Sequence, residues 1–228
     1  MAIQNKRLTF SYDDGVTQDQ RLIYMLNDYG MKCTFNINSG LLGKAGLLNR
    51  CNVTVAHVKP RPDEIAGIYR GHEVAVHTLT HPTLTEQSDE EVIRQVEEDR
   101  KALSELVGYE VVGMAYPNGP WDERVVRLIR ENTGVKYSRT VDANYGFAPQ
   151  TELLAFRPTL HHTEWDKLFA LGEEFLKMNA DSPKIFYVWG HAYEFDIDNT
   201  WGKFGEFLKM MAGRDDISYC TNREAFGI

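Results

Sequence analysis

Short runs of apolar, β-branched or aromatic residues alternate with longer stretches whose apolar residues recur every three or four positions. The short runs predict strands, and the longer stretches predict amphipathic helices. We predict strands over residues 7–11, 32–37, 73–76, 111–115, 137–140, 156–158, 184–189 and 217–219. We predict helices over residues 17–29, 62–69, 89–107, 123–132, 164–178 and 200–212. This alternation is typical of α/β proteins with mostly parallel strands.

Local signals set the limits of several of these helices. Ser88 and Glu91 have the spacing of a capping box, and Asp122 and Thr163 are good first caps for the helices that follow them. Residues 38–60 show neither period, so we expect an irregular insertion there. About seven βα units predict an irregular (β/α)7-type barrel, or alternatively a doubly wound sheet, formed as one domain over residues 1–228.

Two pairs of polar residues follow predicted strands. Asp13 and Asp14 come after the first strand, and His77 and His81 come after the strand at 73–76. Each pair alone could be an ordinary acidic turn or two surface histidines. Taken together, carboxylate and imidazole groups suit a divalent metal such as Zn²⁺ with one coordination position left for water. We hypothesise that Asp14, His77 and His81 hold the metal and that Asp13 takes a proton from water.

Two further strands end in candidate functional residues. The turn of Tyr116, Pro117 and Asn118 follows the strand at 111–115, and His191 follows the strand at 184–189. Parallel α/β folds bind ligands at the carboxyl ends of their strands. We therefore expect the four groups to meet at one rim of the barrel, with a main-chain N–H near Tyr116 available to an oxyanion.

Composition narrows the classes of partner. The formal net charge of −8 disfavours nucleic acid and acidic membrane surfaces as partners. No apolar stretch approaches the roughly 18 residues of a membrane-spanning helix, and the first residues lack a signal-peptide core. The three cysteines, Cys33, Cys51 and Cys220, lack the spacing of a metal site, so we expect reduced thiols and a cytoplasmic location.

The chain resembles the polysaccharide deacetylases, the NodB-homology proteins of carbohydrate esterase family 4. The run Thr9-Phe10-Ser11-Tyr12-Asp13-Asp14-Gly15 is similar to the first family motif, and His77-Thr78-Leu79-Thr80-His81 matches the second. The run Ile185-Phe186-Tyr187-Val188-Trp189-Gly190-His191 looks like the last motif. The resemblance implies Asp13 as catalytic base, His191 as general acid, and Asp14, His77 and His81 as metal ligands. The implied cofactor is one divalent ion, zinc first, with cobalt, nickel, manganese or iron as alternatives.

The chain departs from the family pattern in two places. Ala115 stands where the third motif has the arginine that pairs with the catalytic aspartate. Arg139 or Arg157 could supply that charge, although either could instead form a surface or structural ion pair. Ala192 follows His191 where the family has an aspartate, and Glu194 or Asp196 could orient His191 instead.

The remaining histidines and aromatic residues receive plainer interpretations. We expect His161 and His162 to form an exposed loop pair, and His57 and His72 to be structural or to face solvent. One aromatic residue near the rim, Trp189 or Tyr193, could form a wall of a sugar subsite.

The resulting hypothesis is a metal-dependent hydrolase that removes an N-acetyl or O-acetyl group from an amino sugar or other saccharide. Two alternatives stay open at this point. One is a C–N hydrolase that acts on a non-sugar amide, and the other is a degenerate, non-catalytic member that binds carbohydrate.

Overall fold

A curled parallel sheet forms the centre of the protein in the computed structural model, which describes residues 4–50 and 52–228. The strands are β1 (Lys6–Asp14), β2 (Cys33–Ile37), β5 (Glu73–Val76), β6 (Gly113–Ala115), β7 (Tyr137–Arg139), β8 (Leu160–His161), β9 (Lys184–His191) and β10 (Ile217–Tyr219). Their order is β7-β6-β5-β2-β1-β9-β8, and β10 pairs with the beginning of β1. β1 is therefore an interior strand, with β2 and β9 on its two sides.

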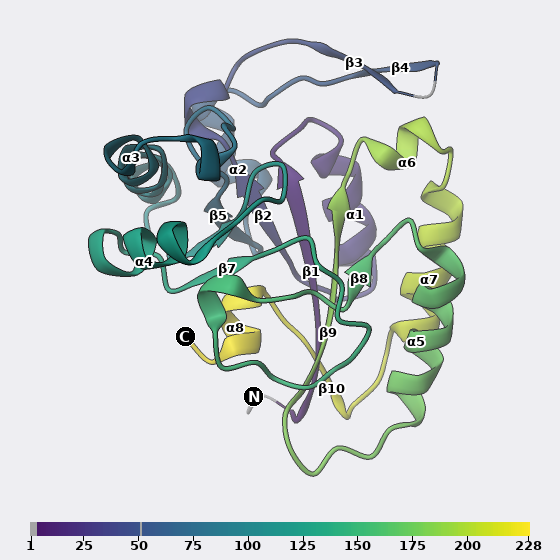
Figure 1. The fold of residues 1–228 in the computed structure, drawn as a ribbon. Helices are drawn as coiled ribbons and strands as arrows, with labels where there is room; N and C mark the ends of the chain where they lie inside the picture. The colour runs from purple at the N-terminus through teal and green to yellow at the C-terminus, as the bar shows by residue number, and fades with distance from the viewer. Residues whose placement is uncertain (1–3, 51) are drawn as a thin grey trace.

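Helices surround the outside of this sheet (Figure 1). They are α1 (Asp19–Asp28), α2 (Ile65–Ile68), α3 (Asp89–Val107), α4 (Glu123–Asn132), α5 (Trp165–Lys177), α6 (Glu194–Ile197), α7 (Trp201–Met211) and α8 (Asn222–Phe226). Single 3-10 turns are η1 (Ser39–Leu41), η2 (Pro62–Glu64), η3 (Leu84–Glu86) and η4 (Leu153–Ala155). None of the helices in the described residues is long and apolar enough to cross a membrane.

One segment, residues 156–162, connects the two edges of the sheet. Phe156 exchanges main-chain hydrogen bonds with β7, through Ser138 and Thr140, and residues 159 and 162 donate to carbonyls of β9. This segment closes much of the gap between the edges, which gives the sheet its curl. The predicted α/β architecture of an irregular (β/α)7-type barrel is confirmed.

Local sequence chemistry explains the helix ends. Ser88 Oγ accepts from the Glu91 N–H at 3.3 Å, and Asp122 Oδ1 accepts from the Val125 N–H at 2.7 Å, as the caps predict. The reciprocal half of the capping box at α3 is absent among these contacts, because the Glu91 carboxylate pairs with Arg94. α5 begins after Glu164, not after a Thr163 cap, because the Thr163 hydroxyl bonds to His161 Nδ1.

The main differences from the structure are two predicted segments and two short helices that were not predicted. Residues 38–60 are not irregular throughout, since they contain η1 and an antiparallel hairpin of β3 (Leu47–Arg50) and β4 (Val53–Ala56). The expected strand at 156–158 is reduced to one bridge at Phe156, and the paired strand β8 lies two residues further on. The short helices α6 and α8 were not predicted, because four or five residues are too few to show a helical period.

The cysteines agree with the expectation of reduced thiols as far as the structure describes them. Cys33 and Cys220 are free and buried. Cys51 lies outside the described residues.

Candidate metal centre and active site

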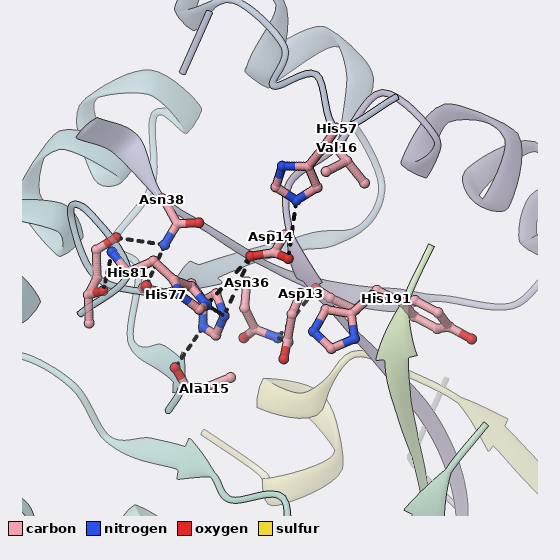
Figure 2. A network of polar contacts seen from close by, with 12 residues as sticks. Asp13, Asp14, Val16, Asn36, Asn38, His57, His77, His81, Ala115 and His191 are labelled. Carbon is pink, nitrogen blue, oxygen red and sulfur yellow. Dashed lines mark hydrogen bonds and ion pairs between the residues drawn. The ribbon is translucent and has the colours of Figure 1, made fainter. Parts of the chain in front are cut away.

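Asp14, His77 and His81 come together at the carboxyl ends of β1 and β5. Asp14 Oδ1 lies 3.6 Å from His81 Nε2 and 4.0 Å from His77 Nε2, and the two imidazole nitrogens are 3.1 Å apart. Figure 2 shows the three side chains converging, with Asp13 and His191 beside them. The loop after β5 allows this because Thr78 and His81 adopt positive φ, so the chain turns back at once.

The protonation states of these groups suit a cation. His77 Nδ1 lies 2.9 Å from the Ala115 carbonyl, which fixes the proton on Nδ1 and leaves the Nε2 lone pair facing Asp14. Burial lowers the pKa of His77 to about 4 and also lowers the pKa of His81. Burial opposes ionisation of Asp14, but His57 and Lys59 outweigh it and hold the pKa of Asp14 well below its usual range.

These three residues therefore fit a divalent ion. Their ligand atoms all lie within 4.8 Å of one another, and they supply two neutral imidazoles and one carboxylate. A set of two histidines and one acid with an open position is typical of catalytic zinc sites and of related metals.

Asp13 is held by a buried arginine and an asparagine. Its Oδ1 accepts from Asn36 Nδ2 at 2.8 Å, and its Oδ2 accepts from Arg139 Nη2. Burial alone would raise the pKa of Asp13, but Arg139 and the nearby histidines outweigh burial and lower it. Arg139 comes from β7, is almost fully buried, and stacks over the Trp189 ring at 4.2 Å. Arg157 instead contacts the Ala143 carbonyl at the surface.

His191 faces the same site from β9. It is the register partner of Asp13 on the neighbouring strand. Glu194 lies 3.3 Å from His191 Nδ1 through its Oε2, which also accepts from the His191 backbone N–H at 3.0 Å. Burial would lower the pKa of His191, but Glu194 outweighs this and raises it. The other candidate, Asp196, accepts from Trp201 Nε1.

The expectation of an exposed pair at His161 and His162 is wrong. His161 Nε2 lies 3.1 Å from Glu194 Oε2, and the fully buried His162 ring stacks between Tyr12 and Phe195. His161 is the second residue of the two-residue strand β8 and His162 follows it, and a strand this short has no pattern from which their positions could be predicted. With Glu194 they bring ligand atoms within 4.8 Å, but that carboxylate already carries Arg50 and the His191 N–H. We interpret His161 as a partner of Glu194 and His162 as a packed core residue, because neither ring nitrogen of His162 has a hydrogen-bond partner among the described residues.

The turn after β6 lies beside the candidate metal ligands. Tyr116 donates its backbone N–H to the Arg139 carbonyl at 3.1 Å and its hydroxyl to the Leu154 carbonyl at 2.7 Å. The N–H of Tyr116 is therefore not available to an oxyanion. Asn118 lies next along the rim with φ of +60°, and its side-chain amide donates to Thr83 at 3.1 Å.

Two residues of the site were missed or misjudged from the sequence. His57, expected to be structural or to face solvent, is partly exposed, and its Nε2 lies 3.5 Å from Asp14 Oδ2, a contact that the sequence did not predict. Lys59 donates to the Asp14 carbonyl and lies 3.7 Å from Asp14 Oδ1. Both come from the segment after β4, whose path past β1 no local pattern reveals. His72 is structural as expected, since its Nδ1 accepts from the Cys33 N–H at 3.2 Å.

A pocket of about 240 Å³ opens above these groups. Asp13, Asp14, His77, His81 and His191 line it, together with Tyr116, Asn118, Gly119, Val141, Trp189 and Tyr193. The two aromatic side chains named as subsite walls therefore both reach the pocket. Every predicted site residue except Pro117 lines this one cavity.

The fold and this geometry define an α/β barrel with a candidate divalent-metal centre and an acid–base pair at its rim. Residues 2–138 match the family model described as polysaccharide deacetylase. The chain therefore belongs to the polysaccharide deacetylase family.

Named relatives agree with this assignment. A peptidoglycan-N-acetylglucosamine deacetylase of Listeria monocytogenes is 28% identical over 128 residues, which are 55% of this chain and 24% of that protein. A chitooligosaccharide deacetylase of Rhizobium leguminosarum bv. trifolii is 31% identical over 116 residues, which are 50% of this chain and 54% of that protein. The matches thus span about a quarter and about half of these relatives.

A solved structure matches the fold over most of the chain. The family 4 carbohydrate esterase from Streptomyces lividans, in complex with acetate, has a TM-score of 0.59 at 14% identity. The match covers 94% of this chain and 91% of that one, so the likeness is one of fold.

Proposed function

We propose that this protein is a metal-dependent deacetylase that hydrolyses the N-acetyl amide of an amino sugar. One observation carries the proposal. An aspartate held ionised by Arg139 and a histidine held by Glu194 flank the cluster of Asp14, His77 and His81 in one small pocket. Base, acid and metal ligands are the three parts that metal-assisted amide hydrolysis needs. Residues 1–228 would form a single NodB-like deacetylase domain.

A divalent ion held by Asp14, His77 and His81 would polarise the acetyl carbonyl and make water a stronger nucleophile. Zinc suits this ligand set best, with cobalt, nickel, manganese or iron as alternatives. Asp13 accepts the proton of the attacking water at its carboxylate, which Arg139 and Asn36 orient. Because its pKa is lowered, Asp13 is ionised and ready as a base at neutral pH.

His191 supplies the proton for the leaving group. Its Nδ1 faces Glu194, so Nε2 is the nitrogen that donates to the departing amine. The raised pKa of His191 keeps this proton in place nearer to neutral pH. As the C–O bond forms and the C–N bond breaks, the products are acetate and a free amine. The main-chain N–H of Asn118, at the turn after β6, is the candidate donor to the oxyanion.

The dimensions of the pocket indicate the size of the substrate. At about 240 Å³ it is smaller than most pockets for drug-sized ligands, which exceed roughly 300 Å³. It suits one acetylated sugar residue against Trp189 and Tyr193. We therefore propose a saccharide substrate whose acetylated residue enters the pocket alone.

The same pocket volume supports a second candidate, a C–N hydrolase acting on a small non-sugar amide. The non-catalytic alternative loses its main support, because Arg139 pairs with Asp13 and Glu194 pairs with His191 although the chain has alanines at the motif positions of the family's arginine and aspartate.

Acetate release tests the proposal. Metal-loaded protein should release acetate from N-acetylated chitooligosaccharides, and Asp13→Asn should lower kcat by roughly 10²–10⁴-fold. Asp13→Asn should keep its metal. Acetate release only from non-sugar amides would favour the second candidate. No release from either class, with metal bound, would contradict the proposal.

A further inference from the structure

The segment that includes β3, β4 and residues 57–59 passes over the carboxyl ends of the strands, beside α6 (Figure 1). Its hairpin has two distinct faces. Leu48 and Val55 are register partners that pack against the core, whereas Leu47 and Thr54 face solvent. The hairpin is thus docked on the protein by its inner face.

The end of this segment holds Asp14 from the side opposite the metal ligands. Asp14 Oδ1 faces His77 and His81, while Oδ2 lies 3.5 Å from His57 Nε2. Figure 2 shows His57 across Asp14 from these two histidines. Carboxylates that ligate metals are commonly held by such an outer partner, which fixes the oxygen presented to the ion.

The middle of the segment holds the second carboxylate of the site. Arg50, at the end of β3, places its Nη1 2.7 Å from Glu194 Oε1. The other oxygen, Glu194 Oε2, accepts from the His191 N–H at 3.0 Å and lies 3.3 Å from His191 Nδ1 and 3.1 Å from His161 Nε2. Because Glu194 is only 3% exposed, Arg50 reaches a carboxylate that is otherwise enclosed.

We infer that this segment is part of the catalytic apparatus, with His57 and Arg50 as positioning residues. His57 sets Asp14 for the metal, and Arg50 sets Glu194 for the general acid His191. A segment outside the family motifs thus joins the two halves of the site. The inference rests on the proposed function for its second half, whereas its first half concerns metal binding alone.

The metal half is tested by affinity and by spectroscopy. His57→Ala should weaken Co²⁺ and Zn²⁺ binding by about 10–100-fold in competition with a chelating dye. It should also alter the visible spectrum of the Co²⁺ protein. His57→Gln, which keeps a donor near the same place, should recover part of the affinity. Thr54→Ala, on the outer face of the same hairpin, should bind metal as the wild type does.

Wild-type affinity and spectrum in His57→Ala would overturn this half, even if the protein proves to be an active deacetylase. Conversely, tight metal binding without acetate release would contradict the proposed function but would not affect the conclusion about His57. The two failures are therefore distinguishable.

The acid half is tested by steady-state kinetics. Arg50→Met should lower kcat by about 10–100-fold, because the proton donor is misplaced. KM and metal affinity should stay near wild-type values. Arg50→Lys should recover part of the rate, and Thr54→Ala again serves as the matched control. A wild-type kcat in Arg50→Met, or an equal loss in Thr54→Ala, would overturn this half.

Discussion

At the scale of single residues, the site depends on charges that are held in fixed pairs. Asp13, from β1, and Arg139, from β7, are both almost fully buried and form an ion pair with each other. His191 and Glu194 form the second pair. Breaking a buried pair leaves one charge without compensation, so the effects on stability and on pKa should be large.

Arg139→Met tests the first pair. It should lower the free energy of unfolding by about 3–5 kcal/mol, because the Asp13 carboxylate stays buried without its cation. It should also raise the pKa of Asp13 and move the acid limb of the activity profile to higher pH. Urea denaturation and a pH–rate profile measure the two effects.

The double variant Arg139→Met/Asp13→Asn provides the control for stability. Removing both charges should recover much of the lost stability without recovering activity. If the double variant is no more stable than Arg139→Met, the pair is not what stabilises this part of the protein.

Glu194→Gln tests the second pair. Glu194 favours the charged form of His191, so its neutral replacement should lower the pKa of His191. A general acid must be protonated, so the basic limb of kcat/KM should move to lower pH. Asp196→Asn is the matched control, because Asp196 lies on the same short helix and bonds to Trp201. Equal shifts in the two variants would contradict the assignment of Glu194.

Single residues also show which parts of the site could be predicted from the sequence. The positions of Asp13, Asp14, His77 and His191 could be predicted because each directly follows or ends an apolar strand, and parallel strands end at one rim. His81 could be placed with them because it lies four residues after His77. Choosing Arg139 over Arg157, or Glu194 over Asp196, required knowing which side chain points inward. The contact of His57 with Asp14 could not be predicted, because it depends on the path of the hairpin of β3 and β4 across the rim of the barrel.

At the scale of secondary-structure elements, β9 carries the general acid and depends on its penultimate glycine. A Cβ at Gly190 would lie 1.9 Å from His162 Nδ1, and that ring is enclosed between Tyr12 and Phe195. The absence of a side chain at Gly190 therefore leaves room for the His162 ring against β9.

Gly190→Ala should lower the free energy of unfolding by about 1–3 kcal/mol, because the new Cβ would overlap the His162 ring, which is buried and stacked between two other rings. Thermal denaturation measures the loss. Gly202→Ala in α7 is the control, since a Cβ there meets nothing within 4 Å. It should be neutral or slightly stabilising. A Gly190→Ala protein as stable as Gly202→Ala would contradict the close packing of the His162 ring against Gly190.

Elements were predictable where their patterns are long. The buried strands β1 and β9 and the long helix α3 follow from apolar runs and a helical period. β3 and β4 were not predictable, because these strands have only four residues each and are mostly exposed. β8 is too short to have a pattern of its own and exists because it pairs with β9.

At the scale of the whole molecule, the buried residue His72 couples stability to pH. It directly precedes β5 and contacts the first residue of β2. His72 accepts from the Cys33 N–H and has its pKa lowered to about 4, by burial and by Lys32. Its pKa in the unfolded chain is near 6.5. Between these values the unfolded chain binds more protons, so stability should fall as pH drops from about 6.5 to 4.

His72→Asn tests this linkage. The asparagine oxygen can accept the same hydrogen bond but does not titrate, so the variant should lose stability less steeply between pH 6.5 and 4. Urea denaturation of both proteins across this range measures the difference. Identical pH slopes would show that His72 does not contribute.

The central claim is that Asp14, His77 and His81 form a metal centre. Its most direct test is the metal content of wild type and of His77→Ala/His81→Ala after equilibration with Zn²⁺ and dialysis. We expect about one ion per chain in the wild type and almost none in the double variant. His161→Ala, in the neighbouring histidine cluster, should keep its ion. Equal metal content in the wild type and the double variant would contradict the account.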